Sequence, residues 1–275
     1  MLLRDTKTSR WQSVTDQPVF QWSAIGLTVI ISLAVLLWQL ESTLIPAAVD
    51  HIIEEVPPEF FDEIGEDMVS DLISSGFTES TLTSKQQAEV HAVFDGLRNE
   101  LQLDARHTLH LYHWATDANA FALPGAQIVV TDELVHRLGM GNQLKAVLLH
   151  ELGHTTFQHV EASMLRASLI GLGSVLLIGD ISYLSLAAAS VSTTVLERTF
   201  SREQEIEADT YAARYFLARD EDPEALVSAL ENLSAEVESG EHAWLSTHPS
   251  NEERVRLIRG AYSRGKDGGE YGVEI

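Results

Sequence analysis

The sequence predicts an α+β protein that is predominantly α-helical, with one small β-sheet and one transmembrane helix ahead of it. Apolar residues recur at three- and four-residue spacing through most of the chain, for example over 142–159. Two short stretches, 108–114 and 127–131, are instead typical of β-strands. No charged residue occurs between Asp16 and Glu41, a gap long enough for a membrane span.

The first predicted element is an apolar helix over residues 24–40. Trp22 and Trp38 stand near its two ends, where aromatic side chains anchor a helix at the membrane interface. A cleavable signal peptide is the alternative, but the apolar core is long and no small-x-small cleavage site follows it closely. We therefore expect a retained, single-pass membrane anchor.

The basic residues predict the orientation of this anchor. Arg4, Lys7 and Arg10 precede the helix, and the next basic residue after it is Lys85. Because positively charged segments stay on the cytoplasmic side, we expect segment 1–23 to be cytoplasmic. The bulk of the chain should then lie on the periplasmic or extracytoplasmic side of the cell membrane.

Composition excludes several classes of function. The chain has no cysteine, so disulfides and thiol catalysis are excluded. The formal charge is −23; residues 1–23 carry three basic and two acidic side chains, which leaves 15 basic and 39 acidic, a net −24, for the rest. A domain this acidic should be repelled by nucleic acid and by anionic lipid, so we expect no nucleic-acid partner.

An acidic, partly helical lead-in over 41–83 should pack on the main domain, which we place at 84–260. Its apolar side chains fall on one helical stripe: Phe60, Phe61, Ile64, Met68, Leu72 and Ile73. Ser84 with Gln87 forms a capping-box signal that would open the first helix of the domain. A polar, glycine-containing tail over 261–275 should end the chain.

The stretch 108–114 alternates apolar and polar residues, as a half-buried strand does. His107, His110 and His113 lie in or beside it, but on a strand their spacing alternates between the two faces, which argues against a shared metal ion.

The central motif is the run His150-Glu151-Leu152-Gly153-His154 in the predicted helix 142–159. On a helix His150 and His154 project from one face, where both imidazoles can bind one metal ion. Glu151 can then reach a water on that metal without being a ligand, which is the His-Glu-x-x-His arrangement of zinc peptidases. Gly153 costs helix stability, and close approach of another backbone or of a substrate would explain it.

Two histidines are not enough, because a catalytic zinc takes three protein ligands and one open position. A second predicted helix, 201–217, places Glu205 and Asp209 four residues apart on one face. Glu205 would be the metal ligand, and Asp209 would be the carboxylate that supports a ligating histidine. An acidic, solvated helix face is the other interpretation, which we prefer for Glu203 and Glu207.

A family resemblance favours the first interpretation for Glu205. Its motifs are His150–His154, Ser201-Arg202 with Glu205 and Ala208-Asp209, Asn119–Gly125 followed by Gln127–Thr131, and Ser246–Pro249 followed by Glu253-Arg254. In this order they resemble the zinc metalloendopeptidases of the HtpX and CAAX-prenyl-protease family, which includes the periplasmic BepA-type proteases. They cover residues 84–258, about two-thirds of the chain.

The resemblance implies a zincin-like metallopeptidase domain of the gluzincin type. It implies one Zn²⁺ per chain, bound by His150, His154 and Glu205, with Glu151 as general base and Asp209 in support. Its substrates would be polypeptides.

The segment after Pro124-Gly125 is similar to that family's edge strand, apart from Ala126, where the family more often has a second glycine. An exposed edge strand beside a zinc site can bind a substrate backbone as an added strand. We therefore expect Ala126, Gln127, Ile128 and Val129 to contact the substrate.

His248 follows the second zinc helix, and Pro249 stiffens the backbone beyond it. Three roles remain open from the sequence. His248 could stabilise the oxyanion during catalysis, or it could occupy the open zinc position as a latch. It could also be a loop histidine that only makes hydrogen bonds.

The stretch 167–196 is almost wholly apolar. It could form two buried helices or a membrane hairpin, and either half alone is short for a span. Because His150, His154 and Glu205 must meet on one side of the membrane, an odd number of crossings is excluded. We expect buried helices.

The predicted function is that of a membrane-anchored zinc endopeptidase. The resemblance adds cleavage of misfolded or exposed protein segments, as protein quality control at the envelope. A zinc-dependent chaperone or binding protein without proteolysis is the alternative, and a structural zinc site is a third. Glu151 argues against both, since metal ligation does not need it. The sequence does not indicate an oligomeric state.

Overall fold

The computed structural model describes residues 18–114, 118–178, 200–234, 248 and 252–266. Contacts between residues divide the chain into two units, Met1–Ile52 and Ile53–Ile275. Most of the predicted cytoplasmic segment, the second half of the apolar stretch 167–196 and the end of the predicted tail lie outside the described residues.

The first unit is helical. Helix α2 (Pro18–Gln39) continues through a short π-helical segment, η1 (Leu40–Leu44), into α3 (Ile45–Glu55). Within the described part of the chain, Trp22–Glu55 is the one helix long and apolar enough to cross a membrane, and none of its apolar window is buried. The predicted N-terminal apolar helix is confirmed, and it is consistent with membrane anchoring.

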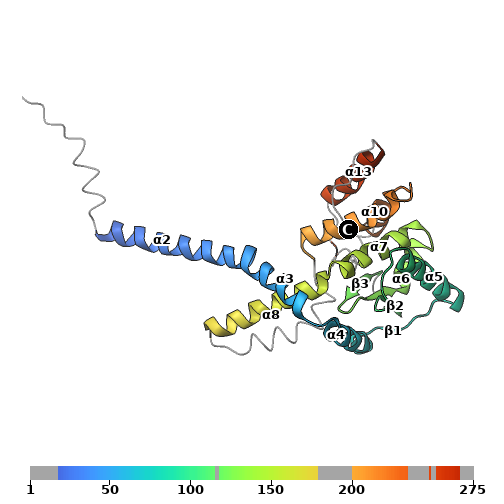
Figure 1. The fold of residues 1–275 in the computed structure, drawn as a ribbon, viewed down its shortest axis with the longest axis horizontal. Coiled ribbons are helices and arrows are strands. Elements are labelled where there is room, and N and C mark those ends of the chain that lie inside the picture. Colours follow the sequence, from blue (N-terminus) through green and yellow to red (C-terminus); the bar gives the residue numbers. More distant parts are fainter. Residues whose placement is uncertain (1–17, 115–117, 179–199, 235–247, 249–251, 267–275) are drawn as a thin grey trace, which may run out of the picture. The chain divides into compact units, whose positions relative to one another are not determined.

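The second unit contains a four-stranded mixed sheet (Figure 1). Its strands are β1 (Thr78–Glu79), β2 (Thr108–His113), β3 (Ala120–Leu123) and β4 (Gln127–Thr131), in the spatial order β1-β2-β4-β3. The pair β2/β4 is parallel, whereas β1/β2 and β3/β4 are antiparallel. The predicted fold class, mostly helical with one small sheet, is confirmed.

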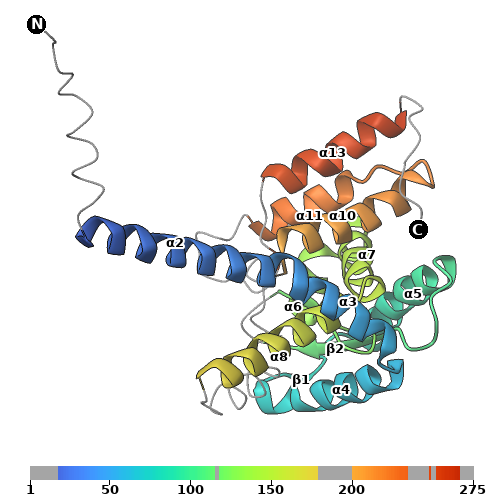
Figure 2. The same cartoon turned by 60° about the vertical axis from the view of Figure 1, so that its left-hand side comes forward.

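Helices form the rest of the second unit. In chain order they are α4 (Pro58–Asp71), the 3₁₀ turn η2 (Ile73–Ser75), α5 (Ser84–Glu100), α6 (Asp132–Leu138), α7 (Asn142–Thr156), α8 (His159–Ile178), α10 (Arg202–Leu217), α11 (Glu224–Ser234) and α13 (Glu252–Lys266). Figure 2 shows α7 between the sheet on one side and α10 and α11 on the other, with α13 outermost.

Helix α7 lies at the centre of this unit, because its apolar side chains are buried against neighbouring elements on more than one side. Val147, Leu148, Leu149 and Leu152 are fully buried. A β-carbon at Gly153 would lie 2.9 Å from the α-carbon of Ala208 in α10. The glycine therefore lets α7 and α10 approach closely, as its position in the motif predicted, and this brings the motif against α10.

The prediction that the segment after Pro124-Gly125 is an edge strand is wrong. Strand β4 pairs with β2 on one side and with β3 on the other, and all five of its residues are buried. Just before it, the Ala126 carbonyl accepts a 3.1 Å hydrogen bond from the Thr108 N–H. Ala126, Gln127, Ile128 and Val129 therefore have no free backbone edge for a substrate strand. The outer strand on this side of the sheet is β3.

Two further expectations differ from the structure. The capping box of α5 is formed by Thr83 and Gln86, one residue earlier than Ser84 and Gln87. In the C-terminal half of α8, three apolar side chains are exposed to solvent: Ile170, Leu172 and Leu176 are 44%, 46% and 77% exposed. The expected burial of 167–196 is therefore not found for these three residues, and residues 179–196 lie outside the described part of the chain.

Candidate metal centre

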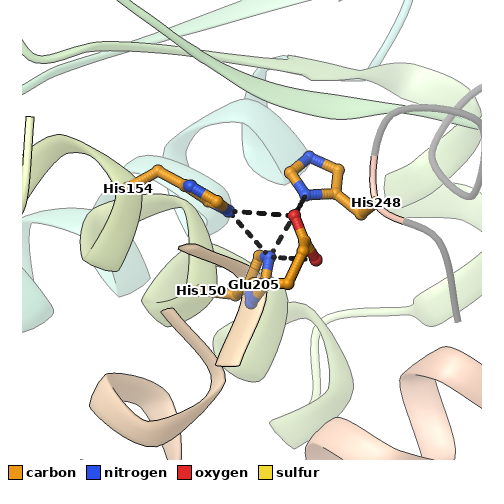
Figure 3. Close-up of side chains that lie close together, drawn as sticks. All are labelled: His150, His154, Glu205 and His248. Atoms are coloured by element: carbon orange, nitrogen blue, oxygen red, sulfur yellow. Dashed lines mark hydrogen bonds and ion pairs between the residues drawn. The ribbon is translucent and has the colours of Figure 1, made fainter. Parts of the chain in front are cut away.

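Four side chains from three parts of the second unit meet beneath α7 (Figure 3). Helix α7 contributes His150 and His154, α10 contributes Glu205, and His248 precedes α13. One potential ligand atom from each lies within 4.8 Å of the other three, and all four residues are buried.

The distances among the predicted ligands fit a tetrahedral metal site. The Nε2 atoms of His150 and His154 are 3.1 Å apart. The Glu205 carboxylate oxygens lie 3.6 Å from His150 Nε2 and 3.5 Å from His154 Nε2. Zinc bonds of about 2.0–2.1 Å at tetrahedral angles place ligand atoms about 3.3 Å apart. The side chains are therefore already arranged as a zinc ion requires.

The charge at this site also fits a divalent cation. Glu151, Glu205 and Asp209 are between 0% and 3% exposed, and besides the three histidines Arg254 is the basic side chain that an ion pair places against them among the described residues. Three carboxylates and one guanidinium carry a formal charge of −2. Burying uncompensated charge is costly, and a bound divalent ion would offset it.

The protonation state of His154 agrees with metal binding. Burial holds the pKa of His154 well below its ordinary value, so this imidazole is neutral at physiological pH, the form that ligates a metal. Its other ring nitrogen, Nδ1, lies 2.9 Å from Nδ1 of His159, whose Nε2 is 3.1 Å from a Glu207 oxygen. His159 was not predicted, and Glu207 was expected only as a solvated acid. No helical spacing could have found His159, because α7 ends between it and His154.

Asp209 lies where the sequence suggested, behind the first motif histidine. Its Oδ1 is 3.0 Å from Nδ1 of His150, so it can fix that ring with Nε2 towards the ligand cluster. Burial raises the pKa of Asp209, but the Arg254 hydrogen bonds and the His150 contact outweigh this and lower it below its ordinary value. Asp209 is therefore an ionised hydrogen-bond acceptor.

Arg254 belongs to a motif that the sequence analysis quoted, but its role at the site was not predicted. It is fully buried, and its Nε and Nη2 donate to the two Asp209 oxygens over 2.7 and 2.8 Å. Its Nη1 lies 2.7 Å from Glu205 Oε2 and donates to the His248 carbonyl over 3.3 Å. One guanidinium thus contacts the candidate ligand Glu205, the aspartate that supports His150 and the backbone of His248.

His248 provides the fourth potential ligand atom of the cluster. Its Nδ1 lies 2.9 Å from Glu205 Oε1 and 3.2 Å from His150 Nε2, which is the spacing of a fourth tetrahedral ligand. Its Nε2 is 3.5 Å from an oxygen of Glu151. Glu151 therefore faces this fourth position from the same helix that carries the two motif histidines.

The three histidines near β2 do not converge. His107 contacts Asp104 at 2.9 Å, His110 contacts Gln127 at 2.7 Å, and His113 contacts Glu133 at 2.7 Å. Each ring thus has a different polar partner, as the alternation along the strand predicted.

Comparison with known proteins identifies a family and several relatives. The model of peptidase family M48 matches residues 84–262. The chain is 28% identical to metalloprotease LoiP of Escherichia coli over 155 residues, which cover 54% of this chain and 60% of LoiP. It is 28% identical to the mitochondrial metalloendopeptidase OMA1 of Arabidopsis thaliana over 140 residues, covering 51% of this chain and 28% of OMA1.

A third relative is the β-barrel assembly-enhancing protease of Escherichia coli, 28% identical over 155 residues that cover 52% of this chain and 32% of the relative. The match thus spans less than two-thirds of each of these three proteins. The family model covers more than half of this chain, and it includes α7, α10 and the start of α13. The predicted family is confirmed: the chain belongs to peptidase family M48.

Proposed function

We propose that this protein is a membrane-anchored, zinc-dependent endopeptidase that hydrolyses peptide bonds in misfolded or exposed protein segments. His150, His154 and Glu205 hold the zinc ion, and Glu151 is the general base. The observation that carries the proposal is the convergence of these ligand atoms at tetrahedral spacing, with Glu151 beside the fourth position.

The chemistry divides between the metal and the protein. When bound, zinc supplies Lewis-acid chemistry that makes a water acidic and a carbonyl electrophilic. Glu151 takes the proton of the attacking water and delivers it to the leaving amine, because its carboxylate is buried beside the position that the reacting groups would occupy. Asp209 holds the His150 ring, and Arg254 holds both Asp209 and Glu205.

For His248 we propose the latch role. Its Nδ1 lies among the ligand atoms at the spacing of a fourth ligand, and a donor to the oxyanion would instead lie beside a fourth position left open. In this arrangement a substrate must displace the imidazole before Glu151 can act. The latch would keep basal proteolysis low in a protein that has no other control visible in its described residues.

We further propose that Trp22–Glu55 anchors the protein in the cell membrane, with the N-terminus in the cytoplasm and the catalytic unit outside. The exposed apolar helix and the basic residues ahead of it support this orientation. A role in envelope protein quality control is supported by similarity to a relative named for enhancing β-barrel assembly.

The test is cleavage of an unfolded substrate such as reduced casein by the full chain in detergent. We expect cleavage that 1,10-phenanthroline abolishes and that added zinc restores. Cleavage that is unaffected by the chelator would refute the metal-dependent mechanism. A zinc-loaded protein that binds casein and leaves it intact would refute the endopeptidase and favour a binding protein.

A further inference from the structure

A pocket of about 300 Å³ lies beside the metal centre, at the C-terminal end of α7. The start of α4, the loop before β2, the β3–β4 turn and the α7–α8 junction line it. The residues that matter here are Phe61, Arg106, His107, Gly125, Thr156 and Glu161. We call it the Glu161 pocket. None of the expected site residues apart from Ala126 belongs to it, and the proposed mechanism does not use it.

Glu161 is buried, only 4% exposed, in the first turn of α8. Its Oε1 accepts a 3.1 Å hydrogen bond from the Gly125 N–H, whereas Oε2 has no hydrogen-bond partner among the described residues. Burial raises the pKa of this carboxyl to about 7. An unpartnered carboxylate oxygen in a buried position is costly unless a donor or a cation meets it.

His107 supplies a second free acceptor. It is 7% exposed, and its Nδ1 lies 2.9 Å from Asp104 Oδ1. Because a carboxylate can only accept, Nδ1 of the neutral ring carries the hydrogen, and Nε2 carries a lone pair. That Nε2 is buried and has no partner among the described residues. Two residues that line the pocket therefore each hold a buried acceptor atom without a partner among the described residues, and a ligand that donates could satisfy both.

The surrounding charge selects a cation. Arg106 lines the pocket, but its guanidinium is paired with Asp104 at 3.0 Å and with Asp62 at 3.6 Å. Glu161 keeps no ion pair within the described part of the chain. The C-terminal end of α7 adds the negative end of one helix dipole, and the N-terminal end of α8, which carries Glu161, adds the positive end of another. An anion would meet the Glu161 carboxylate directly, whereas an ammonium could donate to both Glu161 and His107.

The pocket lies within reach of a chain bound at the metal centre. Thr155 and Thr156, in its wall, follow the candidate ligand His154 directly. Gly125, also in the wall, follows the end of β3 by two residues, but all four residues of β3 are buried. A polypeptide that passes the C-terminal end of α7 would therefore bring one of its side chains to this pocket.

We propose that the Glu161 pocket binds the ammonium or guanidinium group of a basic side chain in the polypeptide substrate. This rests on the proposed function and adds a preference for lysine or arginine near the scissile bond. A volume of about 300 Å³ is at the small end of ligand pockets, which suits one long side chain.

The first test measures binding without proteolysis. The full chain in detergent is titrated with n-butylammonium at constant ionic strength, with 1-butanol as the neutral control, and affinity is taken from the concentration dependence of the melting temperature. We expect the ammonium to bind and butanol not to bind. Glu161→Gln, which keeps an acceptor for the Gly125 N–H, should weaken the affinity at least tenfold, whereas Glu66→Gln, at an exposed position of α4, should not change it.

A second variant controls for the possibility that Glu161→Gln does not fold. Gln158 is exposed and lines the pocket, so Gln158→Lys leaves the buried contacts intact and adds a tethered ammonium at the pocket. We expect it to weaken the affinity for n-butylammonium at least tenfold. Equal affinity of wild type, Glu161→Gln and Gln158→Lys would overturn the proposal.

The second test uses cleavage. Peptides that the wild type cuts are compared in pairs: at one position within four residues of the scissile bond, one peptide has lysine and the other has norleucine, an uncharged analogue that is shorter by one atom. We expect kcat/KM to favour lysine at least tenfold at one position, and this ratio to fall to about 1 in Glu161→Gln but not in Glu66→Gln. No preference at any position would overturn the proposal. A wild type that cuts no peptide would refute the proposed function instead, and the binding test would still report on the pocket.

Discussion

Replacing Arg254 with methionine should be the most destabilising single substitution in the outer helices. Methionine keeps much of the aliphatic volume but removes the guanidinium that bonds both oxygens of Asp209 and reaches Glu205. Two carboxylates that are 2–3% exposed then lose their cationic partner. Breaking a buried ion pair by removing one partner costs about 3–5 kcal/mol.

The assay is thermal unfolding of the metal-free chain in detergent, because bound zinc would raise the melting temperature by itself. In a protein of this size 1 kcal/mol corresponds to about 2–4 °C, so we expect the melting temperature to fall by about 6–20 °C. Arg254→Lys, which keeps the charge and loses the two-pronged contact, should fall between the wild type and the methionine variant.

Arg259→Met is the matched control, because Arg259 lies on the same helix and pairs with Glu224, but its side chain is 49% exposed. An exposed ion pair contributes little to stability, so the shift should be far smaller than that of Arg254→Met. If Arg254→Met shifted the melting temperature no more than Arg259→Met, the buried network would not have the energetic role that its geometry implies.

Four further outcomes are expected. Glu205→Ala should lose zinc affinity together with activity, measured as bound zinc per chain; unchanged zinc content would place the third ligand elsewhere. His248→Ala should raise basal casein cleavage and speed removal of zinc by a chelator, whereas a fall in kcat of roughly 10²-fold would instead identify an oxyanion donor. The pKa of Glu161, about 7 in the folded protein against an ordinary 4.5, means that the folded state keeps a proton that the unfolded state releases. The free energy of unfolding should therefore fall by about 3 kcal/mol as pH rises from 4.5 to 7, and Glu161→Gln should lack this fall in a pH series of melting curves; the same pH dependence in both proteins would disprove the assignment. A reporter active only outside the cytoplasm should work when fused after Ile275, and activity of only a cytoplasmic reporter would reverse the orientation.

The helices of the metal centre could be predicted because their geometry is local. Spacing of four residues places His150 with His154, and Glu205 with Asp209, on single helical faces whatever the rest of the fold does. Gly153 likewise predicted a close approach, which the contact with Ala208 explains. Here a short-range rule was enough to identify the candidate site.

The sheet order could not be predicted in the same way. Strands β3 and β4 are both short and apolar, and the family resemblance placed the sheet edge at the segment after the Pro-Gly turn, which is β4. Its parallel partner β2 precedes β3 in the chain, and nothing in the local pattern indicates that β2 reaches past β3 to pair with β4. The edge was therefore assigned to the wrong strand.

The contacts behind the ligands were missed for a related reason. Arg254 lies in a helix with many charged residues, and only its contacts with Asp209 and Glu205, 45 and 49 positions earlier in the chain, distinguish it from the exposed Arg256 and Arg259. His159 bonds His154 across the break between α7 and α8, where the helical spacing rule no longer applies. Such partners depend on how the elements pack.

The central claim, that Glu151 is the base of a zinc peptidase, is tested most directly by Glu151→Gln. The change keeps the size of the side chain and leaves His150, His154 and Glu205 in place, so zinc content should remain at one per chain. Casein cleavage should be abolished, because glutamine cannot accept the proton of the attacking water. A variant that keeps its zinc and still cleaves casein, or one that loses its zinc, would contradict the account.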